Sequence, residues 1–456
     1  MCVKYHLAAL FVLIVLPKAT VSDLACHRKH EDYFKYLATK TGYRFIQDEN
    51  DRPLTYPGCE LTKLWGLVRH GTRLPGDKII DKMRNLLVTL QKDIVDQYAL
   101  GKSNLCDVSS FKSWTPRVRV DNLEKSLTKE GQRELLALGQ RLKNRFPTLL
   151  NQKFKNETFF FKYTKTQRTQ ESALQFAEGV FGREDATEVW FPPSQKQDPI
   201  LRFYKACDKW RQTVDHNPAA YEEQEKFEQS REYKDMVAAV SRRLGYERNL
   251  TAADVKLMYT TCAFETAWHP EFESPWCTIF SRQDLELLEY NEDVDYYWID
   301  GHGYPLTGNI ACVAFQDMFD HMSADSSRDV VFYFTHSGTL LKFLTHLAIY
   351  NDSAPLTHNS FHRMKNRKWR VGRIDAFGTN LVFAKYTCQD EDYLLTLHQE
   401  KPVVLPGCTS PLCPLATLER TYHKSLHECH FEEMCRYEGD KTGESLRDEN
   451  TDHDEL

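Results

Sequence analysis

The sequence predicts an α/β fold in which helices flank a mostly parallel central sheet, with an inserted smaller helical domain. Three short apolar segments, Leu64–Val68, Thr158–Tyr163 and Val330–Phe334, are rich in aromatic or branched residues and predict buried strands. Apolar residues at helical spacing follow each segment along the chain. Strands that alternate with helices in this way are typical of a parallel sheet.

A charged loop follows the first of these strands, where residues 69–75 read Arg-His-Gly-Thr-Arg-Leu-Pro. At the carboxyl end of a strand in an α/β sheet, such a loop faces the crevice where ligands bind. Arg69 and Arg73 can offer forked donors to an anion, because guanidinium stays charged and fits phosphate geometry. Gly71 removes a side chain that would block close approach. Between two cations His70 favours its neutral form, which leaves a ring nitrogen free to attack phosphorus.

The same seven residues resemble the RHGxRxP signature of the histidine acid phosphatases. The alternative is a surface loop in which a histidine falls between basic residues by chance. The resemblance implies the histidine phosphatase fold and a two-step hydrolysis of phosphate monoesters, in which His70 becomes phosphorylated and water then releases phosphate. It also implies that arginines and a histidine take the place of a metal, so no cofactor is expected.

The next predicted helices and the domain division follow from apolar spacing and composition. Apolar residues from Ile79 to Ile94 predict a helix after the charged loop, and Thr128 is suited to cap a second helix that runs to Pro147. Residues 23–182 and 300–435 are predicted to form the α/β phosphatase domain. The charged, helical segment over residues 183–299 is predicted to form a smaller domain that roofs the cleft.

The second strand also delivers an arginine to its carboxyl end. Arg168 lies near the start of the following helix, whose free N–H groups favour anions. For an isolated arginine in a polar loop, solvation or a salt bridge is the usual explanation. The spacing of Arg168 from Ser172, Ala173 and Phe176, however, resembles the R-T-x-x-S-A-x-x-F element of the family. The resemblance therefore implies that Arg168 is a third phosphate-binding arginine.

The third strand ends at His336, which we expect to bind the phosphoryl group opposite His70. The family places an Asp, or an Ala-Glu pair, directly after this histidine. This chain has Ser337 and Gly338, so the acid that would protonate the leaving oxygen is absent from its expected place. Proton delivery is worth about 10²–10⁴-fold in rate. Either another acid enters the cleft, or the substrate or a water supplies the proton, or the protein is a poor enzyme.

The resemblance covers nearly all of the chain from Cys59 to Cys435, and residues 296–305 are most similar to the multiple inositol polyphosphate phosphatases. It implies an inositol polyphosphate substrate such as inositol hexakisphosphate (phytate). His70 would be the nucleophile and the proton donor is unknown. The side chains that would hold the phosphate oxygens are those of Arg69, Arg73, Arg168 and His336. The alternative, favoured by Ser337-Gly338, is a catalytically weak or inactive protein that binds inositol polyphosphates.

The two ends of the chain indicate the lumen of the endoplasmic reticulum. Residues 1–22 have the pattern of a signal peptide, because Lys4 precedes an apolar run, Leu7–Leu16, that is too short to span a bilayer. No later run approaches the roughly 18 apolar residues of a membrane span. The last four residues, His453–Leu456, match the HDEL address that a retention receptor reads. Residues 436–456 are expected to form a mobile tail that exposes this address.

Cysteine usage fits such a compartment. Of the 13 cysteines, Cys2 would leave with the signal peptide, and the even number that remains could pair in an oxidising lumen. No CxxC spacing occurs, which makes zinc a weak interpretation. Sequence alone does not determine pairing, but the family resemblance implies Cys59 with Cys388 and Cys262 with Cys277. Motifs that accept glycans where they are exposed begin at Asn156, Asn249 and Asn351.

The overall charge excludes one class of partner. The formal net charge is −6 at pH 7, which argues against a nucleic-acid-binding protein with its conspicuous basic face. It does not exclude a polyanionic substrate, because the field inside a cleft is set by local residues.

Overall fold

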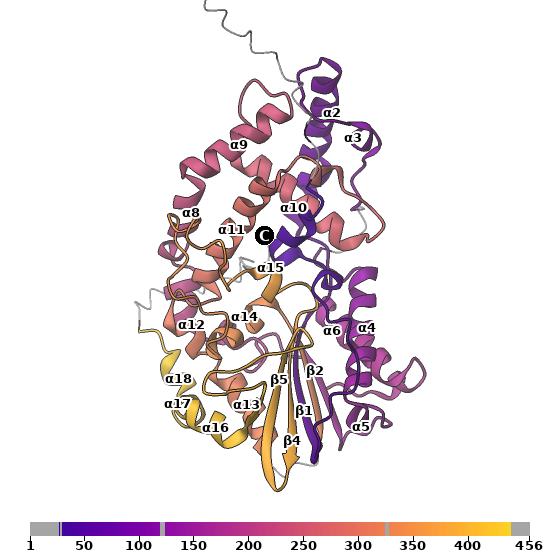
Figure 1. Ribbon diagram of the computed structural model, residues 1–456, viewed down its shortest axis with the longest axis vertical. Helices are drawn as coiled ribbons and strands as arrows, with labels where there is room; N and C mark the ends of the chain where they lie inside the picture. Colours follow the sequence, from indigo (N-terminus) through magenta and orange to yellow (C-terminus); the bar gives the residue numbers. More distant parts are fainter. Residues whose placement is uncertain (1–26, 28–29, 119–123, 324–327, 439–456) are drawn as a thin grey trace, which may run out of the picture.

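A computed structural model describes residues 27, 30–118, 124–323 and 328–438. The predicted signal peptide and the HDEL address lie outside these residues, as does nearly all of the predicted tail. In the view of Figure 1, a sheet with helices on both faces fills the lower part of the molecule, and helices alone build the upper part. The helices of the described part of the chain are too short or too polar to cross a membrane.

The sheet confirms the three predicted strands and their parallel arrangement. Its order is β2-β3-β1-β4-β5-β6, and β3 pairs in parallel with both β2 and β1. The pairings of β1 with β4, of β4 with β5, and of β5 with the short strands β6 and β7 are antiparallel, so the sheet is mixed. The strands are β1 (Cys59–Arg69), β2 (Phe159–Tyr163), β3 (Val330–Thr335), β4 (Asn380–Cys388), β5 (Glu391–His398), β6 (Lys401–Pro402) and β7 (Leu412–Pro414).

This topology brings four chain segments to one edge of the sheet. Arg69 at the end of β1 pairs with Thr335 at the end of β3, and β2 ends one register position away. Because β4 is antiparallel to β1, its first residue, Asn380, lies at the same edge, opposite Val68. The loops after β1, β2 and β3 therefore meet the segment that leads into β4.

Helices cover both faces of the sheet because side chains alternate along each strand. Leu64 and Val68 of β1 pack in one core with α4 (Lys129–Arg145) and α6 (Gln167–Phe181). Trp65 and Leu67 pack in a second core with α13 (Cys312–Ser323) and α14 (Ser337–His346). The result is a three-layer α/β/α arrangement (Figure 1).

Of the two helices predicted after the first strand, the second is confirmed and the first is divided. Thr128 caps α4, because its side chain accepts a hydrogen bond from the backbone N–H of Gly131 at 3.1 Å. The single helix expected across Ile79 and Ile94 is in fact two helices, α1 (Asp77–Arg84) and α2 (Leu86–Ala99), which meet at Asn85. Asparagine competes for backbone hydrogen bonds and therefore favours helix ends, and the apolar spacing did not reveal this break.

The upper part of the molecule contains most helices of the segment over residues 183–299. These include α8 (Glu222–Glu228), α9 (Arg231–Arg243), α10 (Ala252–Trp268) and α11 (Arg282–Ile299), and Figure 1 shows α2 and α3 (Ser109–Ser113) beside them. Buried residues of α10 and α11 share a continuous core with Trp65 and Leu67 of the sheet. The boundaries of a separate inserted domain therefore stay a prediction.

Disulfides join distant parts of the chain, and every cysteine of the described residues is in one. Both pairs that the family resemblance implies are present. Cys59–Cys388 joins β1 to β4, and Cys262–Cys277 joins α10 to the segment that follows it. Three further bonds are Cys207–Cys435, Cys312–Cys429 and Cys408–Cys413. The asparagines of the three glycosylation motifs are exposed.

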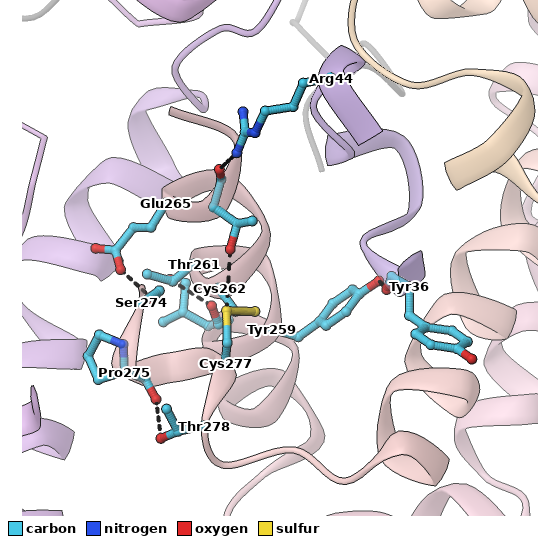
Figure 2. The surroundings of a disulfide bond; sticks show 12 residues. Tyr36, Arg44, Tyr259, Thr261, Cys262, Glu265, Ser274, Pro275, Cys277 and Thr278 are labelled. Atoms are coloured by element: carbon cyan, nitrogen blue, oxygen red, sulfur yellow. Dashed lines mark hydrogen bonds between the residues drawn. A yellow bond between two sulfur atoms is a disulfide. The ribbon is translucent and has the colours of Figure 1, made fainter. Parts of the chain in front are cut away.

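Figure 2 shows how the Cys262–Cys277 bond secures α10. Near this bond, the Arg44 guanidinium donates to the carbonyl of Thr266, and the Tyr259 hydroxyl donates to the carbonyl of Tyr36 (Figure 2). The helix is thus tied both to its own following segment and to the chain before β1. This anchoring matters because α10 also contacts the loop after β1.

Candidate active site

The predicted site residues converge at the carboxyl edge of the three parallel strands. The backbone N–H of His70 donates to the carbonyl of Thr335 at 3.0 Å, which joins the loops after β1 and β3. The ring centroids of His70 and His336 are 5.6 Å apart. Arg168, at the start of α6, places its Nη2 atom 3.2 Å from Nδ1 of His336. Three segments far apart in sequence therefore form one site.

The hydrogen bond of His70 defines its tautomer. Nδ1 lies 2.9 Å from the carbonyl oxygen of Gly71. Because a carbonyl only accepts, Nδ1 carries the hydrogen in the neutral ring, and Nε2 holds the lone pair. Burial, followed by the charges of Arg168, Arg69 and Arg73, holds the pKa of His70 well below its usual value. His70 is therefore a neutral imidazole whose Nε2 is available as a nucleophile.

His336 is held by protein groups on both ring nitrogens. A guanidinium only donates, so Nδ1 accepts from Arg168, and Nε2–H donates to the hydroxyl of Thr164 at 2.9 Å. Burial and the charge of Arg168 keep the pKa of His336 well below its usual value. In this arrangement His336 orients Arg168. Its expected contact with the phosphoryl group stays a prediction.

Arg69 and Arg73 are both 4% exposed and are fixed by different neighbours. Nη1 of Arg69 donates to the carbonyl of Thr39 at 3.1 Å and forms an ion pair with Oδ2 of Asp375 at 3.3 Å. Nη1 of Arg73 donates to the carbonyl of Leu74 at 2.9 Å. The indole of Trp268, on α10, donates to the carbonyl of Arg73 at 2.9 Å. The two guanidinium groups are therefore preorganised, which favours binding of an anion.

Gly71 lets the backbone of α4 lie close to the loop after β1. A Cβ atom at position 71 would lie 2.5 Å from the carbonyl oxygen of Gly131 on α4. The sequence explained Gly71 by close approach in general terms, and the structure shows that the approaching group is a helix backbone. Beneath the same loop, the Glu134 carboxylate accepts the backbone N–H of Thr72 at 2.7 Å. α4 thus supports the nucleophile loop directly.

Arg202 is a fourth cation at the site, and the sequence analysis did not find it. Its positive charge contributes to the lowered pKa of His336. The carbonyl of its neighbour Leu201 accepts hydrogen bonds from Thr335 at 2.7 Å and from Thr339 at 2.6 Å. These bonds hold the segment beside the β3–α14 loop. No motif marks Arg202 in the sequence, because its position depends on this tertiary contact.

Two carboxyl groups lie beside the positions where the family has its acid. The Ser337 hydroxyl donates to Oδ2 of Asp375, so an acid at position 337 would face a carboxylate. A Cβ atom at position 338 would lie 3.3 Å from Oδ1 of Asp300, which is ion-paired with Lys342. Asp375 and Asp300 therefore border the positions at which the family has its proton-donating acid. No motif in the sequence marks either residue.

Chemically, the arrangement can hold a tetrahedral anion among arginines and present a neutral imidazole to it. His70 is 1% exposed, so a phosphoryl group must lose water to reach it, and the surrounding positive charges offset that cost. The described residues contain no group of three or more His, Cys, Asp or Glu side chains that could hold a metal ion.

Comparisons with known proteins agree with this chemistry. Residues 60–399 match the family described as the histidine phosphatase superfamily (branch 2). Multiple inositol polyphosphate phosphatase 1 of Drosophila melanogaster is 32% identical over 445 residues, which cover 94% of each chain. The human protein of the same name is 27% identical over 432 residues, or 88% of each chain.

Solved structures share the fold. The phytase from D. castellii has a TM-score of 0.71 at 16% identity, and the match covers 88% of this chain and 87% of that one. A multiple inositol polyphosphate phosphatase of Bifidobacterium longum, in complex with inositol hexasulfate, has a TM-score of 0.64 at 15% identity. That match covers 84% of this chain and 97% of the other.

Proposed function

Because this chain belongs to the histidine phosphatase superfamily (branch 2), we propose that it hydrolyses phosphate monoesters of inositol polyphosphates such as inositol hexakisphosphate. The observation that carries the proposal is the neutral, arginine-surrounded imidazole of His70, whose Nδ1 is bound to Gly71 and whose Nε2 has no hydrogen-bond partner among the described residues. The names of the Drosophila melanogaster and human relatives support the choice of substrate class.

The proposed reaction has two steps. In the first, Nε2 of His70 attacks phosphorus, the bond from phosphorus to the ester oxygen breaks, and the leaving oxygen takes up a proton. In the second, water attacks the phosphohistidine, the N–P bond breaks, and phosphate leaves while His70 returns to its neutral form. Arg69, Arg73 and Arg168 would stabilise the negative oxygens of both transition states. The source of the first proton is left open.

Release of phosphate from inositol hexakisphosphate by purified protein tests this proposal. His70→Ala should lower the rate by at least about 10³-fold, because the covalent route is lost. His362→Ala is the matched control, since this histidine is exposed and lies outside the site. Equal inertness of the wild type and His70→Ala against several phosphate esters would contradict the proposal. Tight binding of the hexakisphosphate without release would instead support the alternative of an inactive binding protein.

We further propose that the protein resides in the lumen of the endoplasmic reticulum. The signal-like residues 1–22 and the terminal HDEL sequence support this location, and so do the disulfides and the exposed glycosylation motifs. Deletion of His453–Leu456 should move the protein from the cell to the medium. Equal retention of both forms, or absence of glycans on Asn156, Asn249 and Asn351, would count against it.

A further inference from the structure

A second basic cavity lies apart from the residues around His70. Its volume is about 600 Å³, within the range of small-molecule sites, and it lies where α11 and α15 (Val371–Ile374) contact each other. None of the five predicted catalytic and phosphate-binding residues is among the described residues that line it. The cavity is therefore not the active site itself.

Cations dominate the lining of this cavity, although the whole chain has a net charge of −6. The only acids among its described lining residues are Glu286 and Glu289. The basic side chains are those of Arg282, Lys365, Arg367, Arg370 and Arg373. Five positive charges face two negative ones in the lining, and Asp293, which pairs with Arg367, is a third acid. The remaining excess of two positive charges favours an anionic ligand.

Two of these cations are held rigidly by acids. Glu289 accepts from Nη2 of Arg367 at 3.1 Å and from Nη2 of Arg370 at 2.7 Å, and all three residues are buried. Arg367 also pairs with Oδ2 of Asp293, so two carboxylates fix these two guanidinium groups and match their charges. Forked donors fixed in this way are suited to phosphate oxygens.

Two further cations have no acidic partner among the residues that the structure describes. Lys365 and Arg373 are exposed at the cavity, and neither forms an ion pair within the described residues. Partial burial, followed by the positive charge of Arg370, lowers the pKa of Arg373. Arg282 is paired with Glu286 at 2.8 Å, so the excess charge resides on the Lys365 and Arg373 side.

We propose that this cavity is a second polyanion site, which binds a small molecule carrying several phosphate groups. A single phosphate would engage only part of the lining, whereas several groups on one compact molecule can reach both the fixed arginines and the exposed cations. α11 also contacts the segment before β1, because Glu292, one turn after Glu289, binds the buried Lys40 at 2.8 Å. The carbonyl of the adjacent Thr39 accepts from Arg69 of the active site. The assignment rests on charge and geometry and does not require turnover.

Calorimetric titration with inositol hexasulfate, which is not a phosphate ester, tests the proposal independently of hydrolysis. The wild type should bind two equivalents. Lys365→Glu/Arg373→Glu should lose the second equivalent or bind it at least about tenfold more weakly, because two attractive contacts become repulsive. The matched control is Arg363→Glu/Lys424→Glu, which changes the charge equally at exposed positions outside the cavity and should keep both equivalents.

Two results would overturn the assignment. One is a wild type that binds a single equivalent, and the other is retention of two equivalents by Lys365→Glu/Arg373→Glu with unchanged affinity. Inorganic phosphate serves as the second probe and should bind the cavity at least about tenfold more weakly than the hexasulfate, because it engages fewer cations. Equal affinity for the two probes would also contradict a polyanion site. Thermal unfolding of both double variants checks that they are folded.

Discussion

The carboxylate of Glu134 accepts a hydrogen bond at 2.7 Å from the backbone N–H of Thr72, two residues after His70. It also accepts the Thr72 hydroxyl at 2.9 Å and the backbone N–H of Tyr43 at 2.9 Å. One buried side chain of α4 therefore joins the nucleophile loop to the chain before β1. Glu134 touches no reacting atom, so we regard it as a positioning residue.

Glu134→Gln should lower kcat by about 10–100-fold, because an amide NH₂ would face one of these N–H donors and displace the loop. KM should change less, since the arginines remain. Glu157→Gln, at an exposed position, is the control. Steady-state kinetics on inositol hexakisphosphate provide the measurement, and an unchanged kcat would exclude the positioning role.

The acid limb of the activity profile should lie well below pH 6.5. His70 must be neutral to attack, and burial with three nearby arginines holds its pKa well below the ordinary value. Removal of one positive charge makes protonation easier, so Arg168→Gln should shift the acid limb of kcat/KM to higher pH. A limb that stays in place in this variant would show that another group controls it.

Asp375→Asn should slow the hydrolysis of inositol hexakisphosphate and of p-nitrophenyl phosphate to a similar extent, about tenfold or more. The reason is that Asp375 holds Arg69, which both substrates need. p-Nitrophenolate leaves readily without a proton, whereas the inositol oxygen needs one. Loss of a proton donor would therefore slow only the inositol ester, and loss of positioning would slow both substrates. A loss confined to the inositol ester would identify Asp375 as the proton donor instead.

The double variant Cys262→Ser/Cys277→Ser should be less stable by about 3 kcal/mol. The bond closes a loop with a sequence separation of 15, and loops of this length give about that loss in the chain-entropy account. Unfolding by urea at pH 7 measures the change. Because α10 contacts the nucleophile loop through Trp268, activity should also decline at a lower temperature than in the wild type.

Glu265 should make stability depend on pH. Burial raises its pKa from 4.5 to about 7 in the folded protein, so the folded state keeps a proton that the unfolded state releases between these values. Its contribution to stability is therefore greatest below pH 4.5 and falls by about 3 kcal/mol as pH rises through 7. Glu265→Gln should lack this dependence. Urea unfolding of both proteins at pH 5 and pH 8 tests the difference.

The sequence by itself determined the elements whose signals are local. Each of the three parallel strands contains a segment rich in aromatic or branched apolar residues. His70 and His336 follow β1 and β3 directly, and Arg168 lies at the start of the helix after β2. Parallel strands end at one edge, so these residues were expected to meet, and the structure brings them together.

Only the tertiary structure located the residues that support this site. Asp375 reaches Arg69 because β4 runs antiparallel to β1. Arg202 lies near His336 because its neighbour Leu201 binds the β3–α14 loop. Glu134 reaches Thr72 because two glycines let α4 approach the loop after β1. None of these contacts has a local signature. Strand formation depends on neighbouring residues, but the meeting of side chains far apart in sequence depends on how strands pair and helices pack.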